Sequence, residues 1–360
     1  MPRVVEVRPE NFPFDSNLFQ SAFWARFKQR RGYQTQTFWI DYEGRTSPLV
    51  LVHRPCAENA GFGYIPHGPD IDLPPEQHGP FLEKVSEQIR SRLPDECRFL
   101  RYDLPWPSPY GRGEEGGREA GQPPEPRIRE LRMNFGCRRW NLHKAPTDMQ
   151  APDTVLLDLN RPASRILSDM HKKARYCVRS AFRRGVRIER RGPELLPDWH
   201  RLYAQMAERK GIAFESLEYF QALFAAARGR QPRIRLYAAF RNSELLAGSI
   251  FAFHAPSSQA TYLFSASSAE GRRQTAAYPV LWKAIMDAKT DGCRWFDFFG
   301  IPPADRPEHP MHGLYRFKTR FGGDILRMRG CWDYPFDEQM YSMLAFSFST
   351  KDAYHPSQKH

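Results

Sequence analysis

Apolar and polar positions follow two different periods along the chain, and each change of period marks an expected element. Phe19, Phe23 and Phe27 recur every four residues, which predicts a helix over residues 17–31. Further along, apolar runs rich in β-branched and aromatic residues predict strands at 37–42, 47–53 and 98–104, with a helix at 75–93 between the last two. The segment 61–69 is rich in glycine and proline, and we expect a loop there.

The second half of the chain repeats this alternation. A strand at 154–159 is followed by a long basic helical pattern within 161–191, helices at 199–210 and 217–228, and strands at 233–241, 245–254 and 259–266. A helix at 276–291 and a strand at 294–299 come next, and a strand at 324–334 and a helix at 336–347 close the chain. The pattern predicts an α/β (α+β) protein with mixed sheets flanked by helices.

With 360 residues the chain is long enough for two cores, and we place the domains at residues 1–152 and 153–336. Residues 337–360 are expected to form a C-terminal helix and a polar tail. Residues 105–126 are rich in proline, glycine and glutamate, which predicts a mobile surface loop within the first domain.

The formal net charge of +12 and the isoelectric point near 9.5 favour polyanionic partners, such as RNA, a nucleotide-diphosphate sugar or an anionic membrane surface. The basic segment 161–191 is the densest part of this charge. Its helix carries an apolar stripe, and a solvated polar face is one explanation of the cations. Like charges at this spacing repel one another, so a bound polyanion is the other explanation. The cations include Lys172, Lys173, Arg175 and Arg179.

The six cysteines are scattered without a Cys-x-x-Cys pair, which argues against a zinc site or a disulfide framework. We expect reduced thiols in a cytoplasmic protein, because no signal-peptide pattern or membrane-spanning apolar segment is present. Motifs for phosphate-binding loops, zinc proteases and serine hydrolases are missing, and no metal or cofactor is expected.

One stretch near the C-terminus combines a buried-strand pattern with a cationic helix. The strand 294–299 stops at Gly300-Ile301-Pro302, and residues 313–321 follow as a short helix in which Leu314, Phe317 and Phe321 share an apolar face. Lys318 lies between the aromatic residues of that helix, and Gly322 and Gly323 end it. This arrangement can hold a cation in a cleft, although a core helix with solvated cations is the simpler interpretation.

The stretch "RWFDFFGIP…GLYRFKTRFGG" resembles the C-terminal signature of the FemABX family, which forms peptidoglycan bridges. Four further segments, "QSAFWARFK", "GFGYIPHGP", "MHKKARYCVR" and "AERKGIAF", resemble that family in the same order. The resemblance implies two tandem N-acetyltransferase-like (GNAT-like) domains. It also implies an aminoacyltransferase of cell-wall biogenesis that moves an amino acid from aminoacyl-tRNA to an amine of the precursor's stem peptide.

The resemblance also implies roles for individual residues. Lys318, beside Phe317, would be catalytic by facing the oxyanion of the transfer reaction. Substrate contacts would come from Lys28, Tyr102, Arg209, Tyr262 and Tyr315. Contacts to tRNA would come from Lys172, Lys173, Arg175, Arg179, Arg316 and Arg320. For Asp297 we favour a structural hydrogen-bonding role, and the alternative is that it accepts a proton during the reaction.

The expected partners are aminoacyl-tRNA and either UDP-MurNAc-pentapeptide or a lipid-linked precursor, with a peripheral contact to the inner membrane face and a monomeric chain. Two alternatives remain open. One is a GNAT-fold acyltransferase with another donor or acceptor, although "EGRRQTAAYP" lacks the glycines of an acetyl-CoA loop. The other is a non-catalytic basic RNA-binding protein.

Overall fold

The computed structural model describes residues 1–12, 16–110 and 124–349, and its contacts group them into two compact units. The first unit comprises Met1–Pro152 and the stretch that begins at Arg327, and the second unit comprises Asp153–Leu326. The chain thus returns to the first unit at Arg327, whereas the sequence had placed residues up to 336 in the second domain. The reason is non-local pairing, because strand β13 (Asp324–Pro335) pairs with strands of the first unit.

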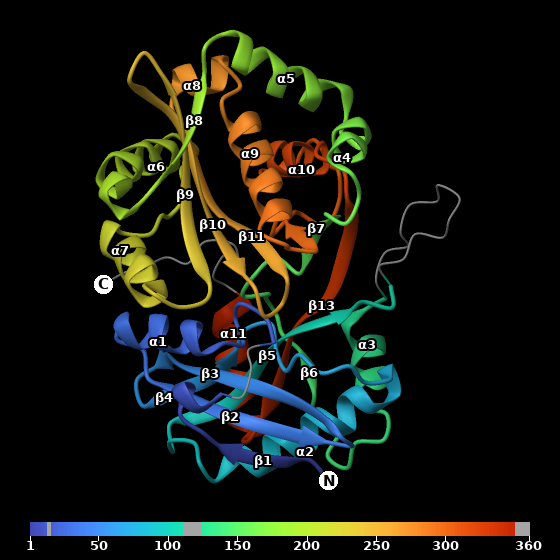
Figure 1. Ribbon diagram of the computed structural model, residues 1–360. Helices are drawn as coiled ribbons and strands as arrows, with labels where there is room; N and C mark the ends of the chain where they lie inside the picture. The colour runs from blue at the N-terminus through green and yellow to red at the C-terminus, as the bar shows by residue number, and fades with distance from the viewer. Residues whose placement is uncertain (13–15, 111–123, 350–360) are drawn as a thin grey trace. The chain divides into compact units, whose positions relative to one another are not determined.

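The sheet of the first unit begins as an antiparallel run of β1 (Arg3–Glu6), β2 (Thr35–Tyr42), β3 (Arg45–Ala57) and β4 (Ala60–Ile65). Strand β5 (Cys97–Pro107) pairs in parallel with β4, and β13 pairs antiparallel with both β5 and the short β6 (His143–Lys144). Helix α1 (Ala22–Arg30) packs on β2 and β3, and α2 (His78–Arg90) forms the crossover between β4 and β5 (Figure 1).

The sheet of the second unit has the same topology. Strands β8 (Arg187–Arg191), β9 (Arg233–Arg241), β10 (Glu244–His254) and β11 (Gln259–Ser267) form the antiparallel run. Strand β12 (Trp295–Asp297) pairs in parallel with β11 after the crossover helix α9 (Ala277–Thr290), and β7 (Asp153–Asp158) pairs antiparallel with β12. The predicted mixed α/β architecture with two tandem GNAT-like domains is confirmed.

Helices cover both faces of the second unit's sheet (Figure 1). Helices α6 (Leu196–Lys210) and α7 (Leu217–Ala227) pack on β9, β10 and β11 on one side. On the other side α9 contributes Val280, Leu281, Ala284 and Ile285 to the core, next to the buried stripe of α5 (Lys172–Arg183). The helix α10 (His312–Thr319) adjoins this core through half-buried Tyr315 and Phe317.

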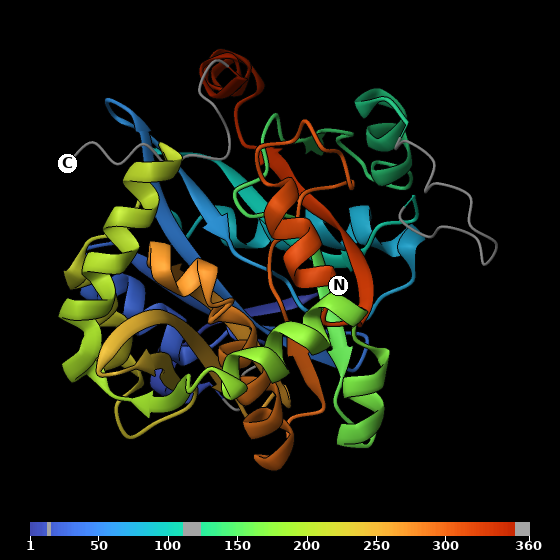
Figure 2. The same ribbon diagram turned by 90° about the horizontal axis from the view of Figure 1, so that it is seen from above.

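Two local expectations were wrong. The basic pattern 161–191 contains two helices, α4 (Ala163–Asp169) and α5, because Met170 has extended backbone angles and the His171 side chain caps α5 by accepting from the Lys173 amide. The two helices run in different directions (Figure 2). The expected loop at 61–69 begins inside strand β4, where a Cβ on Gly63 would lie only 2.7 Å from the Leu100 side chain.

Several predicted regions fall partly outside the described residues. Most of the predicted loop at 105–126 lies outside the described residues, because residues 111–123 are not described. Strand β5 extends into the start of this loop, to Pro107, and α3 (Pro126–Met133) begins at the end of the loop. The predicted C-terminal helix is α11 (Glu338–Ser349), and the expected tail from residue 350 onward is not described. Within the described chain, no helix combines the length and the apolar character that crossing a membrane requires.

Candidate functional site

A turn after β12 presents backbone carbonyl groups to the helix α10. Phe299 and Gly300 both have positive φ angles, of 52° and 40°. A left-handed conformation is uncommon for a phenylalanine, so the surrounding contacts must hold this turn in place. The carboxylate of Asp297 does so by accepting a hydrogen bond from the Phe299 amide at 2.8 Å.

Asp297 is itself fixed by neighbouring strands. Its carboxylate accepts hydrogen bonds from the Thr154 hydroxyl and, at 3.2 Å, from the Gln259 side-chain amide. Three donors from three segments therefore orient one nearly buried carboxylate, which is 8% exposed. This geometry supports the structural hydrogen-bonding role of Asp297 that the sequence suggested first.

Lys318 is the buried residue of α10, and its side chain is directed at the turn after β12. Its residue exposure is 5%, and its Nζ donates hydrogen bonds to the carbonyl oxygens of Phe299 and Gly300, the latter at 2.8 Å. The sequence had expected Leu314, Phe317 and Phe321 to face the core, but Leu314 and Phe317 are only half-buried and the lysine lies deeper.

The environment of Lys318 disfavours its charged form. Burial lowers the pKa of the Lys318 amine to about 7, and the negative charge of Asp297 opposes this change only in part. No carboxylate lies within ion-pair distance of Nζ in the part of the chain that the structure describes. The lysine is therefore held by neutral carbonyl groups and can exchange its proton near neutral pH.

An aromatic ring lies close to this amine. The centroid of the Tyr262 ring lies 5.4 Å from Lys318 Nζ, a cation–π contact that the charged form of the lysine would gain. Burial raises the pKa of the Tyr262 hydroxyl to about 12, with hydrogen bonds to Ser265 and Ser249 opposing the shift. The structure thus brings together two residues that the sequence had assigned to separate roles.

The neighbours of Lys318 on α10 have different environments. Phe317 packs edge-to-face on Tyr278 with ring centroids 4.9 Å apart, and Tyr315 packs partly against the same core. Arg316 is exposed. Arg320 donates a hydrogen bond to the Tyr278 hydroxyl at 3.3 Å, so it has a structural contact besides any role with RNA.

The predicted tRNA-contacting residues on α5 divide into two groups. Lys172, Lys173 and Arg179 are exposed, and the opposite stripe of the helix is buried in the core. Arg175 is different, because its guanidinium donates to the carbonyl oxygens of Ser168, at 2.6 Å, and of Met170. Its contacts connect α5 to the end of α4, which gives Arg175 a structural role, and its contact with tRNA stays a prediction.

The remaining predicted substrate residues have other surroundings. Arg209 is exposed at the end of α6, and Lys28 of the first unit lies over the rings of Trp24, Phe27 and Tyr33 at 4.9 to 5.5 Å. Tyr102 is fully buried in the core of the first unit, and its hydroxyl is hydrogen-bonded to that of Ser86 at 2.7 Å. The structure thus shows a buried side chain at this position, and the substrate contact of Tyr102 stays a prediction.

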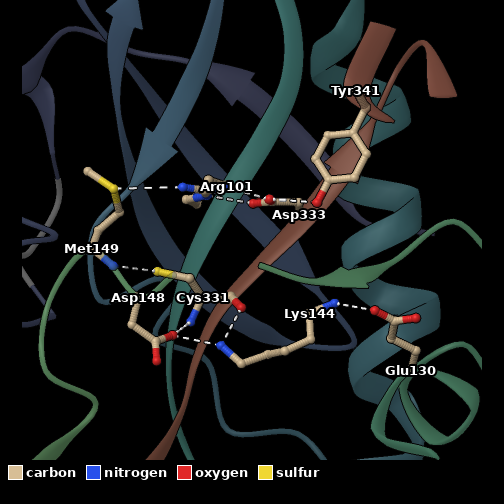
Figure 3. Close-up of polar contacts among 8 residues, drawn as sticks. All are labelled: Arg101, Glu130, Lys144, Asp148, Met149, Cys331, Asp333 and Tyr341. Carbon is tan, nitrogen blue, oxygen red and sulfur yellow. Dashed lines mark hydrogen bonds and ion pairs between the residues drawn. The ribbon is translucent and has the colours of Figure 1, made fainter. Parts of the chain in front are cut away.

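Sequence reasoning missed a charged cluster inside the first unit (Figure 3). Arg101 on β5 and Asp333 on β13 are both fully buried and form a two-point ion pair at 2.7 Å, and the Tyr341 hydroxyl donates to the same carboxylate at 2.9 Å. Close by, Lys144 donates to Asp148 at 2.6 Å and to the Cys331 carbonyl oxygen. Charged residues inside the apolar strand "RFLRYDL" were the available signal.

Among the residues with described positions, no group of histidine, cysteine, aspartate or glutamate side chains could hold a metal ion. Burial raises the pKa of several cysteine thiols, including Cys97 to about 12 and Cys331 well above its usual range. Buried, protonated thiols of this kind are poor nucleophiles. The candidate site around Lys318 offers an amine, two backbone carbonyl groups and an aromatic ring.

Comparisons with known proteins agree with this architecture. A UDP-N-acetylmuramoylpentapeptide-lysine N(6)-alanyltransferase of Weissella viridescens is 28% identical over 194 residues, which are 53% of this chain and 55% of that protein. The alignment therefore spans about half the length of this relative. Two solved structures share the fold. FemX has a TM-score of 0.73 at 16% identity, covering 95% of this chain and 100% of its own. L-PGS from Bacillus licheniformis has a TM-score of 0.51 at 9% identity, covering 95% and 93%.

The FemAB family model matches residues 10–231 and 233–347, which is nearly the whole chain. The match includes both units and the whole segment from β12 to α10 that contains Lys318. The chain belongs to the FemAB family.

Proposed function

We propose that the protein transfers an amino acid from aminoacyl-tRNA to an amine on the stem peptide of a peptidoglycan precursor. Membership of the FemAB family supports transfer to such a precursor in general, and the relative from Weissella viridescens is named for alanyl transfer to the lysine of UDP-N-acetylmuramoylpentapeptide. The observation that carries the proposal is the buried amine of Lys318, which is held by two backbone carbonyl groups without a carboxylate partner in the described chain.

The proposed reaction needs no external source of energy, because an aminoacyl ester is already activated. The lone pair of the acceptor nitrogen attacks the ester carbonyl carbon, a C–N bond forms, and the carbonyl electrons move to oxygen. The oxyanion then re-forms the carbonyl and expels the ribose oxygen of the tRNA, which takes up the proton lost by the amine nitrogen. The enzyme must align both substrates and stabilise the negative charge.

Lys318 has the properties that this charge requires. A protonated amine has three N–H groups, and the carbonyl oxygens of Phe299 and Gly300 accept two of them, which leaves one for the oxyanion. Since burial lowers the pKa of Lys318 to about 7, both protonation states are populated at neutral pH. A developing oxyanion or a nearby phosphate favours the protonated form, so a larger fraction of the lysine would be protonated when the substrates bind.

The donor tRNA is assigned to the exposed face of α5. Lys172, Lys173 and Arg179 supply cations there, and Tyr176, which is 59% exposed, lies one turn from Lys172 and from Arg179. An exposed ring between cations can stack on an unpaired base while the cations contact phosphates. Arg316 provides a further exposed cation on α10.

The test is a transfer assay with purified UDP-MurNAc-pentapeptide and a pool of charged tRNAs, with the product identified by mass. We expect a mass gain of one amino acid for the wild type and a rate about 100- to 1,000-fold lower for Lys318→Ala, as for loss of an oxyanion donor. Lys283→Ala is the matched control, because Lys283 is exposed and pairs with Asp287 at 2.7 Å in the same unit. Equal rates for Lys318→Ala and the wild type would refute the role of Lys318.

The remaining outcomes identify the substrates. If the product forms only from a lipid-linked precursor, the acceptor differs but the reaction class stands. If transfer proceeds from an acyl-CoA and never from charged tRNA, or if RNA binds and no amide forms with either precursor, the proposed function is wrong. Circular dichroism of Lys318→Ala must match the wild type for its activity to be interpreted.

A further inference from the structure

An exposed apolar surface lies on α3 and the turn that follows it in the first unit. Ile128, Leu131, Phe135 and Trp140 have exposed fractions of 42%, 51%, 70% and 50%. We call these four residues the α3 surface. Isolated exposed apolar residues are ordinary, but four large side chains within one short segment indicate a surface that binds something.

The helix accounts for two of these side chains, because Ile128 and Leu131 are three residues apart in α3 and project from one face. Phe135 lies in the turn after the helix, which ends at Met133, and Trp140 follows further along the same segment. The opposite face is buried through Met133, and Asn134 exchanges hydrogen bonds with the backbone of Leu142. The fold is therefore anchored by the buried face and does not need the exposed one.

The α3 surface is bordered by arginines. Five of them lie within residues 125–140, against the two acidic residues Glu125 and Glu130. Arg139 forms an ion pair with Glu87 at 3.5 Å, and Glu130 accepts a hydrogen bond from the Lys144 amide at 2.9 Å. The arginines outnumber the acidic residues of this segment, so its charge is positive around an apolar centre. The arginines are Arg127, Arg129, Arg132, Arg138 and Arg139.

We infer that the α3 surface binds peripherally to an anionic lipid bilayer. An apolar helix face enters the boundary between headgroups and acyl chains, and arginines beside it attract anionic lipid headgroups. Tryptophan, here Trp140, suits this boundary because its ring is amphipathic. Figure 1 shows α3 at the periphery of the first unit.

The side chains distinguish a bilayer from RNA as the partner of this surface. Ile128 and Leu131 are aliphatic and cannot stack on bases, whereas they gain free energy when they leave water for an acyl layer. The exposed face of α5 has the opposite character, with Tyr176 among several cations. The inference does not rest on the proposed transfer reaction, because lipid binding can be measured without any substrate.

The experiment is flotation of the full chain with vesicles of phosphatidylcholine, with and without phosphatidylglycerol. We expect binding to the anionic vesicles that weakens with added salt. The double variant Leu131→Ser with Phe135→Ser should bind about tenfold more weakly. The matched control is Tyr176→Ser with Phe182→Ser, which removes exposed rings from α5 and should leave vesicle binding unchanged.

A second measurement reports the depth of insertion. Trp140 is exposed, whereas Trp24, Trp106, Trp199 and Trp332 are buried and Trp39, Trp282 and Trp295 are half-buried. A lipid with brominated acyl chains should therefore quench Trp140 more strongly than the other tryptophans, and Trp140→Phe should lose most of the quenching. Because all of the substituted side chains are exposed, the variants should melt like the wild type, which circular dichroism would verify.

Several outcomes would overturn the inference. Wild-type protein that does not float with anionic vesicles would do so, as would an equal loss of flotation in the α5 control. A concentration-dependent dimer that the double variant abolishes, without vesicle binding, would assign the surface to a second copy of the chain. A loss of RNA binding in the double variant, with vesicle binding intact, would assign it to RNA.

Discussion

Each unit contains a buried cation, and the two cations differ in their partners: one is paired with a carboxylate and the other with neutral carbonyl groups. Arg101 in the first unit forms a two-point ion pair with Asp333, and both side chains are fully buried. Lys318 in the second unit contacts the carbonyl oxygens of Phe299 and Gly300 instead. Burial acts to lower the pKa of both groups. At Arg101 the charge of Asp333 outweighs it and raises the pKa, whereas at Lys318 the pKa falls to about 7.

The difference separates a structural cation from a candidate catalytic one. A neutralised and hydrogen-bonded pair such as Arg101–Asp333 has no remaining capacity for a substrate. A buried amine without a carboxylate partner costs free energy in the fold, and groups with such perturbed pKa values gather at functional sites. The two sheets share one strand topology, so the topology alone does not assign the role; the side chains do.

The largest expected effect is on the structural pair. Asp333→Asn leaves the charge of Arg101 buried without its partner, and we expect the free energy of unfolding to fall by about 3–5 kcal/mol. Urea denaturation followed by circular dichroism would measure this. The double variant Arg101→Met with Asp333→Leu should recover much of the loss. If Asp333→Asn is as stable as the wild type, the pair does not stabilise the first unit.

The second effect is a pH dependence that belongs to Lys318. Its pKa is about 7 in the fold against 10.5 in the unfolded chain, so between these values the unfolded state binds more protons. Stability should therefore rise with pH in this window, by roughly 2 kcal/mol between pH 7 and 9. Lys318→Met should lack this rise, which denaturation at both pH values would test. An equal rise in the variant would show that other groups cause it.

The smallest of the three effects concerns exposed cations. Lys172→Gln with Arg179→Gln removes two cations from α5 that have no buried role, and we expect tRNA binding to weaken about tenfold with a shallower dependence on salt. Filter binding over a series of salt concentrations measures both quantities. The control is Lys289→Gln on α9, because the amine of Lys289 donates to the Leu159 carbonyl oxygen and is not part of the exposed face of α5. Unchanged affinity and salt slope in the α5 variant would argue against this surface.

Much of the fold and part of the site could be predicted from the sequence, for local reasons. Strands β9, β10 and β11 and the helix α9 lie within a few residues of their expected bounds, because hydrophobic period and turn residues act over short distances. Lys318 was identified because a single lysine among aromatic residues follows a buried strand. The break at Met170 was missed because apolar spacing continues across it.

The order of the elements, the cations of α5 and the candidacy of Lys318 follow from local patterns in the sequence. The burial of Tyr102, the contacts of Arg175 with the end of α4 and the two carbonyl partners of Lys318 are visible only in the fold. Burial and pairing depend on residues that are distant in the chain. Arg101 and Asp333 are 232 positions apart, and no local pattern in the sequence can predict their contact.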